Sequence, residues 1–229
     1  MKAFKLIGML AVVALVSFSA FAADDMPKIY TEDFEDGNAD GWEFTDSSAW
    51  RVEDDSGSKV LCQFKMSEYE PPVRSPHNIA WIKDLYVSDC VIDVRLKSTG
   101  RNYGHRDMCV FFNEQDSSHF YYVHMAPAPP TDPNANKIMI VNGEPRKNIC
   151  TKTNPGLQWK DDTYHHIRVV RDTESGSIKV YFDDMENTVL EAKDDTLKAG
   201  RIGFGNFDDT GCIDNISIKG VKVEKSAVK

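Results

Sequence analysis

The chain has 229 residues, and its 36 Asp and Glu against 27 Lys and Arg give a formal net charge of −9. An acidic chain without a basic, aromatic-rich stripe repels phosphate backbones, so we expect no nucleic acid partner. The same charge disfavours adsorption to anionic bilayer surfaces.

The first 22 residues have the layout of a secretory signal peptide. A short basic start precedes an apolar run over 6–16, and Ala20 and Ala22 place small residues where signal peptidase reads them. Cleavage after Ala22 would make the mature protein secreted or periplasmic. No later segment is apolar for long enough to span a bilayer, so no membrane insertion is expected. Residues 23–229, which number 207 (229 − 22), suit a single large β domain.

Short runs of β-branched and aromatic residues follow the leader, and no long helical periodicity interrupts them. Turn residues separate the runs, a spacing typical of sandwiches and barrels. Because no crossover helices are predicted, the sheets should be antiparallel. The expected strands are residues 28–34, 49–52, 59–64, 85–96, 107–113, 119–125, 137–141, 164–171, 177–182, 188–192, 200–204 and 212–218.

The clearest local unit is a β-hairpin. Residues 167–171 and 178–182 both alternate apolar and polar side chains, and Glu174-Ser175-Gly176 supplies the turn between them. We expect one face of this hairpin to enter the core and the other to carry Arg and Lys to water.

The start, middle and end of the mature chain each carry a recognisable pattern. EDFED at 32–36 is followed by a Gly-Trp pair, the hairpin ends in Asp183-Asp184, and GRIGFG at 200–205 runs into DDTGCIDNI at 208–216. Together these stretches resemble the concanavalin A-like lectin/glucanase superfamily, including its laminin-G-like and 3-keto-disaccharide hydrolase-type domains.

The resemblance implies an all-β, antiparallel jelly-roll β-sandwich. It does not by itself imply one activity, because the superfamily includes binding modules, hydrolases and lyases. Its best-known hydrolases carry two catalytic carboxylates in an E-x-D-x-x-E run on one strand, and this sequence lacks that run. Retaining glycosidase chemistry of that kind is therefore not expected, and no catalytic residue is assigned.

The resemblance also implies a structural calcium ion. The first and last strands of such sandwiches often lie together and share a calcium, which takes six to eight oxygen ligands. The expected metal ligands are Asp33, Glu35 and Asp214, with Asn215 as a further donor. Alternatively, these residues cap turns and face water, since no loop here has a dedicated calcium motif.

A histidine- and tyrosine-rich window, residues 101–125, is the predicted sugar-binding surface. Strand alternation puts Tyr122 and His124 on one face and the more apolar Tyr121, Val123 and Met125 on the other. Aromatic rings stack on sugars while Arg, Asp and His donate or accept hydrogen bonds. The predicted substrate-binding residues are Arg101, His105, Asp107, Tyr122 and His124. Alternatively, these side chains make ordinary surface pairs.

Five cysteines and four tryptophans are expected to be structural. An odd number of cysteines leaves at least one thiol free, and the pairing cannot be read from the sequence. Large aromatics mostly pack in cores. We therefore expect packing in the core or at a sheet edge, and not stacking on sugars, for Trp42, Trp50, Trp81 and Trp159.

Three functions remain open from the sequence. The first is an exported protein that binds a polysaccharide or oligosaccharide without catalysis. The second is a polysaccharide lyase or glycoside hydrolase on the same scaffold, in which Tyr and His move a proton while Arg neutralises a carboxylate. The third is a non-catalytic module whose partner is a protein.

Overall fold

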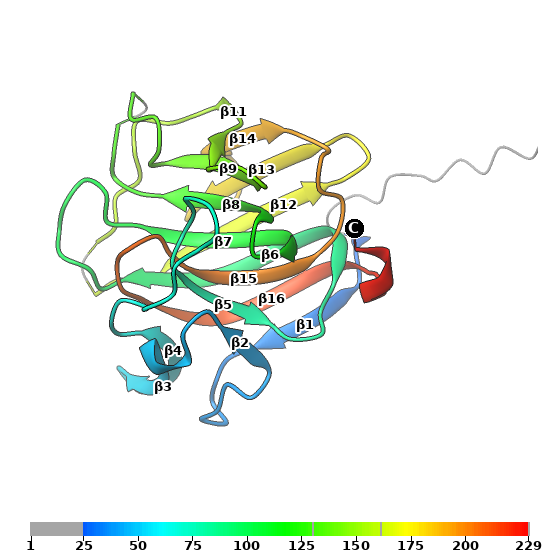
Figure 1. Cartoon of the computed structure of the whole chain (residues 1–229). Coiled ribbons are helices and arrows are strands. Elements are labelled where there is room, and N and C mark those ends of the chain that lie inside the picture. The colour runs from blue at the N-terminus through cyan, green and yellow to red at the C-terminus, as the bar shows by residue number, and fades with distance from the viewer. Residues whose placement is uncertain (1–24, 130, 161, 229) are drawn as a thin grey trace, which may run out of the picture.

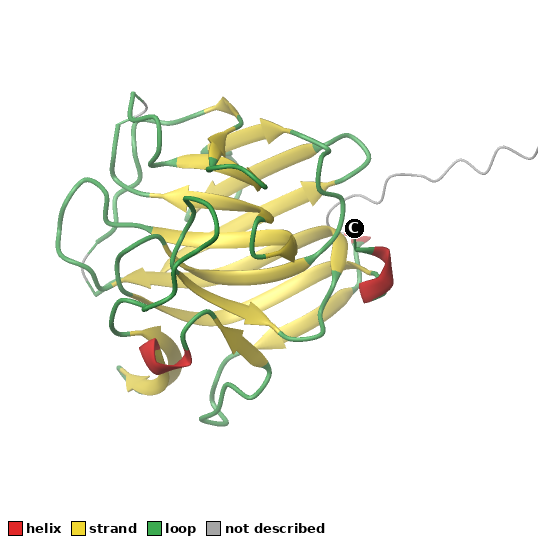
Figure 2. Cartoon of the chain, viewed as in Figure 1, coloured by secondary structure: helices red, strands yellow, loops and turns green. Residues whose placement is uncertain are grey.

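The computed structural model describes residues 25–129, 131–160 and 162–228 (Figure 1). The predicted signal peptide lies outside the described residues. Strands dominate the regular structure, and two short 3-10 helices, η2 (Ser47–Ala49) and η3 (Lys225–Ala227), lie at its edge (Figure 2). Among the described residues, no helix has the length and apolar character needed to cross a membrane.

Two antiparallel sheets pack face to face. Nine-stranded sheet A has the order β11 (Cys150–Lys152), β14 (Leu190–Lys193), β13 (Ser177–Phe182), β12 (His165–Asp172), β6 (Val87–Ser98), β16 (Gly211–Lys222), β4 (Ser58–Gln63) and β3 (Trp50–Asp55), with β1 (Lys28–Glu32) paired to β16. Seven-stranded sheet B has the order β10 (Lys147–Asn148), β9 (Lys137–Asn142), β8 (His119–Met125), β7 (Met108–Asp116), β15 (Arg201–Asn206), β5 (Asn78–Ile82) and β2 (Trp42–Phe44).

The main core lies between the two sheets. Because side chains alternate along each strand, every second residue faces this layer and loses its contact with water, the dominant favourable term in folding. Sheet A contributes Ile92, Val94, Leu96, Ile167 and Val169, and sheet B contributes Val110, Phe112, Tyr121 and Val123.

The prediction of an all-β, antiparallel sandwich is confirmed. Each of the twelve expected strands has a counterpart within a few residues of its predicted bounds. The sequence patterns missed β2, β5, β10 and β11. Of these, β5 matters most for function, because it lies in sheet B beside β15.

The predicted hairpin is β12–β13, with one correction to its faces. Arg171 was expected to reach water, but it is fully buried. Arg171 lies two and four residues after Val169 and Ile167, so the alternation of side chains along the strand places it on the same, core-facing side. Its guanidinium donates to the carbonyl oxygens of Asp194 (2.8 Å) and Leu197 (3.0 Å), which compensates for its burial.

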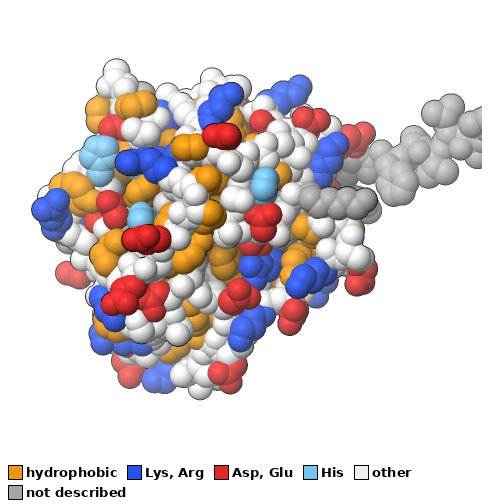
Figure 3. All heavy atoms as spheres, viewed as in Figure 1, with side chains coloured by type: hydrophobic (Ala, Val, Ile, Leu, Met, Phe, Trp, Pro, Cys, Tyr) orange, Lys and Arg blue, Asp and Glu red, His pale blue; other side chains and the backbone are white. Residues whose placement is uncertain are grey.

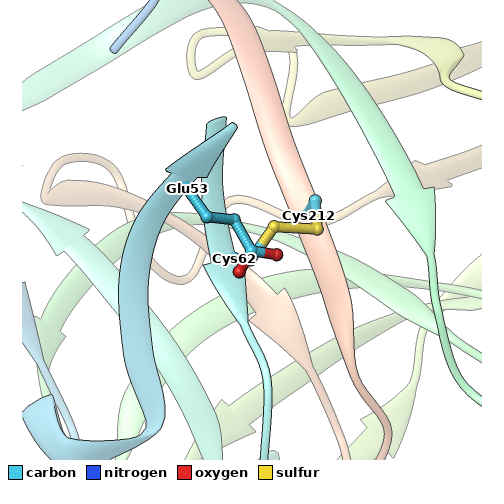
Figure 4. Close-up of side chains that lie close together, drawn as sticks. All are labelled: Glu53, Cys62 and Cys212. Carbon is cyan, nitrogen blue, oxygen red and sulfur yellow. A yellow bond between two sulfur atoms is a disulfide. The ribbon is translucent and has the colours of Figure 1, made fainter. Parts of the chain in front are cut away.

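A disulfide joins β4 and β16 on the outer face of sheet A. Cys62 and Cys212 lie directly opposite each other in the strand register and are bonded, 150 residues apart in sequence (Figure 4). The Glu53 carboxylate lies close to both sulfurs, but bonded sulfurs offer no thiolate to a metal. The cysteines without a disulfide are Cys90, Cys109 and Cys150.

Candidate functional site

The outer face of sheet B is crossed by residues 64–77, which join β4 to β5 and which we call the strap (cyan in Figure 1). Near the β2 edge, the Glu68 N–H donates to the Asp46 carboxylate (3.0 Å). Near the opposite edge, the Arg146 N–H in the β9–β10 connection donates to the Arg74 carbonyl (3.1 Å). The strap therefore spans the sheet and divides its outer face into a closed end and an open end.

At the closed end, two of the residues predicted to bind sugar are covered. Tyr122 and His124 point away from the main core, as alternation predicts, but Tyr122 is fully buried and His124 is 4% exposed. The Tyr122 hydroxyl accepts a hydrogen bond from Arg146 (3.3 Å), and the His124 ring packs beside Phe207. The expectation of an open polar wall at these residues is wrong, because a loop covering a strand face leaves no signal in the strand itself.

The other three predicted sugar-binding residues are split between two places. Asp107 is fully buried beside His124, with its Oδ2 atom 3.3 Å from Nε2 of the imidazole. Arg101 and His105 are exposed on the connection between β6 and β7, where His105 lies 3.3 Å from the Asp132 carboxylate. The five residues therefore do not line one surface, and a role for them in sugar binding stays a prediction.

At the open end, sheet B carries a groove of about 720 Å³. Its floor is formed by β5, β7, β8 and β15, and one wall by the strap. Figure 3 shows apolar surface on this side of the molecule, flanked by acidic and basic side chains. Such a volume is typical of small-ligand sites. The lining includes Glu43, Tyr69, Trp81, Lys83, Glu114, Asp116, Phe120 and Arg201.

The register of sheet B explains the apolar floor of this groove. Trp81 on β5 is directly opposite Glu43 on β2 and Gly203 on β15. A Cβ atom at Gly203 would lie 2.5 Å from the Trp81 ring, so glycine leaves the space in which the indole lies flat on the sheet. Phe111 and Phe120 contact the same ring edge to face. The floor is thus a fixed aromatic platform.

Arg201 organises the polar side of the groove. It is opposite Glu114 on the neighbouring strand and donates two hydrogen bonds to that carboxylate, at 2.7 and 2.9 Å. A third hydrogen bond reaches Glu43 (2.8 Å), and the guanidinium lies 5.5 Å from the Trp81 ring centre. Burial lowers the pKa of Arg201, but its bonds to Glu114 and Glu43 raise it well above its usual range. The cation is therefore permanently charged and held in one orientation.

Tyr69 carries the strap's contribution to the groove. Its ring is half-buried, and burial raises the pKa of its hydroxyl, so the phenol stays neutral and can donate a hydrogen bond. The groove therefore combines aromatic rings with a guanidinium, an ammonium and carboxylates. This is the set of groups that stacks on a sugar ring and binds its hydroxyls.

The residues predicted to hold calcium lie where β1 meets β16. Asp33 and Glu35 follow β1, and the Glu35 carboxylate accepts hydrogen bonds from Ser58 and from the Lys59 N–H. Asp214 is buried on β16; burial raises its pKa, and the negative charges of Glu35 and Asp33 raise it further. Asp33 and Glu35 thus lie close enough to influence the charge on Asp214, but among the described residues these three acids do not form a group with all ligand atoms within 4.8 Å of one another.

Known proteins resemble this chain in fold and hardly in sequence. No family model and no curated protein sequence matches the chain. Carbohydrate-binding module CBM66 from Bacillus subtilis matches with TM-score 0.54 and 14% identity, over 79% of this chain and 96% of that one. A Bacillus subtilis protein of unknown function with a galectin-like fold matches with TM-score 0.58 and 11% identity, over 86% and 97%.

A third match is domain 4 of AbnA, an extracellular arabinanase from Geobacillus stearothermophilus, in complex with arabinotriose. It has TM-score 0.53 and 12% identity, over 88% of this chain and 96% of that domain. The chain shares the antiparallel β-sandwich fold of these structures. These likenesses establish the fold of the chain.

Sequence reasoning missed the groove's main residues. Trp81 was interpreted as packing, which is half right, because it is 6% exposed and yet forms the floor of the groove. Glu114 and Arg201 were not predicted as site residues, because nothing in the sequence distinguishes either of them from the many other charged residues. The usable signal was Asn78–Ile82, a short and mostly apolar strand whose fourth residue is a tryptophan.

Proposed function

We propose that this chain is an exported carbohydrate-binding protein whose ligand, a polysaccharide or oligosaccharide, lies in the groove at the open end of sheet B. The observation that carries the proposal is the Trp81 platform flanked by Arg201, which is fixed in place by two carboxylates. Support also comes from the matched structures, one named as a carbohydrate-binding module and another bound to arabinotriose.

Binding is favoured over hydrolysis by the hydrogen bonds of the groove. Arg201 donates to both Glu43 and Glu114, so both carboxylates act as acceptors. A glycosidase needs one carboxylic acid that gives a proton to the leaving oxygen.

Within the superfamily, we infer from the closing-strand pattern that the chain is allied to the laminin-G-like and 3-keto-disaccharide hydrolase-type domains.

Removing the Tyr69 ring is expected to weaken glycan binding by roughly 5- to 150-fold, the range for one lost stacking contact. Glu43→Gln should also weaken binding, because the amide accepts fewer hydrogen bonds than the carboxylate. A panel of polysaccharides and oligosaccharides that includes arabinotriose would first identify a ligand of the unchanged protein. Titration calorimetry would then compare the affinity of the unchanged protein with that of Tyr69→Ala and Glu43→Gln.

Phe64→Ala is the matched control, because Phe64 is an exposed aromatic of the same strap that does not line the groove. It should bind as the unchanged protein does. Equal affinity for all three variants would refute the groove as the site. Release of unsaturated products or of reducing ends would show a lyase or a hydrolase, and no binding to any glycan would favour a protein partner.

Export is proposed from two independent features. The sequence of residues 1–22 has the layout of a cleavable leader. The Cys62–Cys212 disulfide is suited to an oxidising compartment such as the periplasm or the extracellular space.

We further propose that a calcium ion binds beside Asp33, Glu35 and Asp214. Burial raises the pKa of Asp214, the charges of Glu35 and Asp33 raise it further, and a divalent cation would relieve the repulsion between these acids. After EDTA treatment, added calcium is expected to raise the melting temperature of the protein by roughly 5 °C. Asp214→Asn should abolish that response, and Asp40→Asn, an exposed acid outside the cluster, should preserve it. A melting curve of the unchanged, EDTA-treated protein that does not respond to calcium would rule out the ion.

A further inference from the structure

A second cluster of metal-binding side chains lies at the closed end of sheet B. Cys109 on β7 is directly opposite His124 on β8, so their side chains share one face of the sheet. Asp107 precedes Cys109 by two residues and falls on the same face. Asp107 and Cys109 are fully buried, and His124 is 4% exposed. Local register alone therefore brings a thiol, an imidazole and a carboxylate together in a dry site.

The separations within this cluster suit a tetrahedral metal. The Cys109 sulfur lies 3.2 Å from Oδ2 of Asp107, and Nε2 of His124 lies 3.3 Å from the same oxygen. One donor atom from each of the three residues lies within 4.8 Å of the others. Zinc with ligands at about 2.0–2.3 Å in tetrahedral geometry spaces its donors roughly 3.3–3.8 Å apart, so small side-chain adjustments complete the site.

The imidazole is already oriented as metal-bound histidines are. Nδ1 of His124 lies 2.9 Å from the carbonyl oxygen of Asn134, which fixes the proton on that nitrogen. When Nε2 carries no proton, its lone pair faces the Asp107 carboxylate. Two lone pairs facing each other in a dry site repel, unless a proton or a cation lies between them.

An unsatisfied oxygen points independently to a missing cation. Oδ2 of Asp107 accepts from the Phe207 N–H (2.9 Å), but Oδ1 has no hydrogen-bond partner although the residue is fully buried. Buried carboxylate oxygens without partners are rare and costly. The orphaned oxygen thus needs a positively charged or protonated neighbour.

A second carboxylate beside the cluster increases the requirement for a cation there. Asp209 is buried beside Asp107, and its Oδ2 accepts from the Asp107 N–H and the Tyr103 hydroxyl, both at 3.0 Å. Two buried carboxylates therefore lie side by side at this end of the sheet. The guanidinium of Arg146, stacked on Phe207, offsets part of this negative charge.

We propose that Asp107, Cys109 and His124 bind a zinc ion, and that Asp209, which has a carboxylate oxygen within 4.8 Å of Asp107, moves to supply the fourth ligand. A thiolate and an imidazole select zinc over calcium or magnesium, which require oxygen ligands. The ion would join β7, β8 and the segment after β15 beneath the strap. Such a site, closed to solvent, is structural and lies apart from the groove that we assign to sugar.

Zinc content is the direct test. The mature protein, purified without chelator or reductant, is dialysed against zinc and then metal-free buffer, and its metal is counted by mass spectrometry. One zinc per chain is expected, and cobalt substitution should give a visible thiolate-to-metal absorption. Zinc should also raise the melting temperature by roughly 5–10 °C at about one hundred times its dissociation constant.

Variants then identify the ligands. Cys109→Ser and His124→Gln should each retain less than half a zinc per chain, while Cys90→Ser, which alters another fully buried free cysteine, should retain one. If a ligand variant fails to fold, the thiolate-to-cobalt absorption of the unchanged protein, and its loss when zinc displaces the cobalt, gives the same answer. A metal-free protein with a melting temperature unaffected by zinc, or zinc retained by both ligand variants, overturns the proposal.

Discussion

Replacing Cys62 and Cys212 together with alanine is expected to lower the free energy of unfolding by about 3–5 kcal/mol. The bond spans 150 residues, so reducing it frees a very long loop in the unfolded chain. It also connects β4 to β16, which holds three strands of sheet A. Denaturant titration measures the loss directly, and the melting temperature should fall by roughly 10 °C.

The control is Cys150→Ala, which alters a half-buried cysteine outside the disulfide. Its cost should stay near 1 kcal/mol or less. Dithiothreitol should bring the unchanged protein down to the melting temperature of the double variant and leave the variant itself unaffected. A variant as stable as the parent would show that the sheet alone holds these strands together.

Truncating Arg201 to alanine is expected to cost about 3–5 kcal/mol of stability as well as weakening glycan binding. The Glu114 side chain is 4% exposed, so removal of the guanidinium leaves a buried carboxylate without its bidentate partner. The Trp81 platform also loses the cation beside it. Urea titration at neutral pH checks the stability, and calorimetry with the selected glycan checks the binding.

Two further variants separate the contributions in this second experiment. Arg201→Met with Glu114→Gln removes both charges, and should recover most of the stability but not the binding, because the platform lacks its cation. Arg51→Ala breaks an exposed pair with Glu53 and should cost less than about 1 kcal/mol. If Arg201→Ala lowers the free energy of unfolding no more than Arg51→Ala does, the loss of its guanidinium partner does not destabilise the buried Glu114 carboxylate, and the prediction is wrong.

The architecture was readable from the sequence because strand signals are local. Alternation correctly separated Tyr121 from Tyr122, and the hairpin was predicted with its turn. The missed strand β5 is buried at all five positions, so it shows no alternation to detect. A central strand covered on both faces looks like any short apolar run.

The candidate site was much less predictable, since it depends on contacts between distant segments. Tyr122 and His124 face outward from their strand, but segments far away in the sequence bury them: Val73 of the strap packs against the cluster of Tyr122, Arg146 contacts the Tyr122 hydroxyl, and Phe207 contacts the His124 ring. Likewise Arg201 and Glu114 become partners through the pairing of β15 with β7. Strand pairing of this kind cannot be derived from residue patterns within either strand.

The position of β16 has a consequence for the order in which this protein folds. β16 comes last of the sixteen strands along the chain, yet it lies between β6 and β4 near the middle of sheet A. As the ribosome makes the chain from its N-terminus, β4 and β6 emerge early and keep unpaired edges until residues 211–222 arrive. Sheet A is therefore completed only after nearly all of the chain has been synthesised, and until then its open edges can pair with other chains.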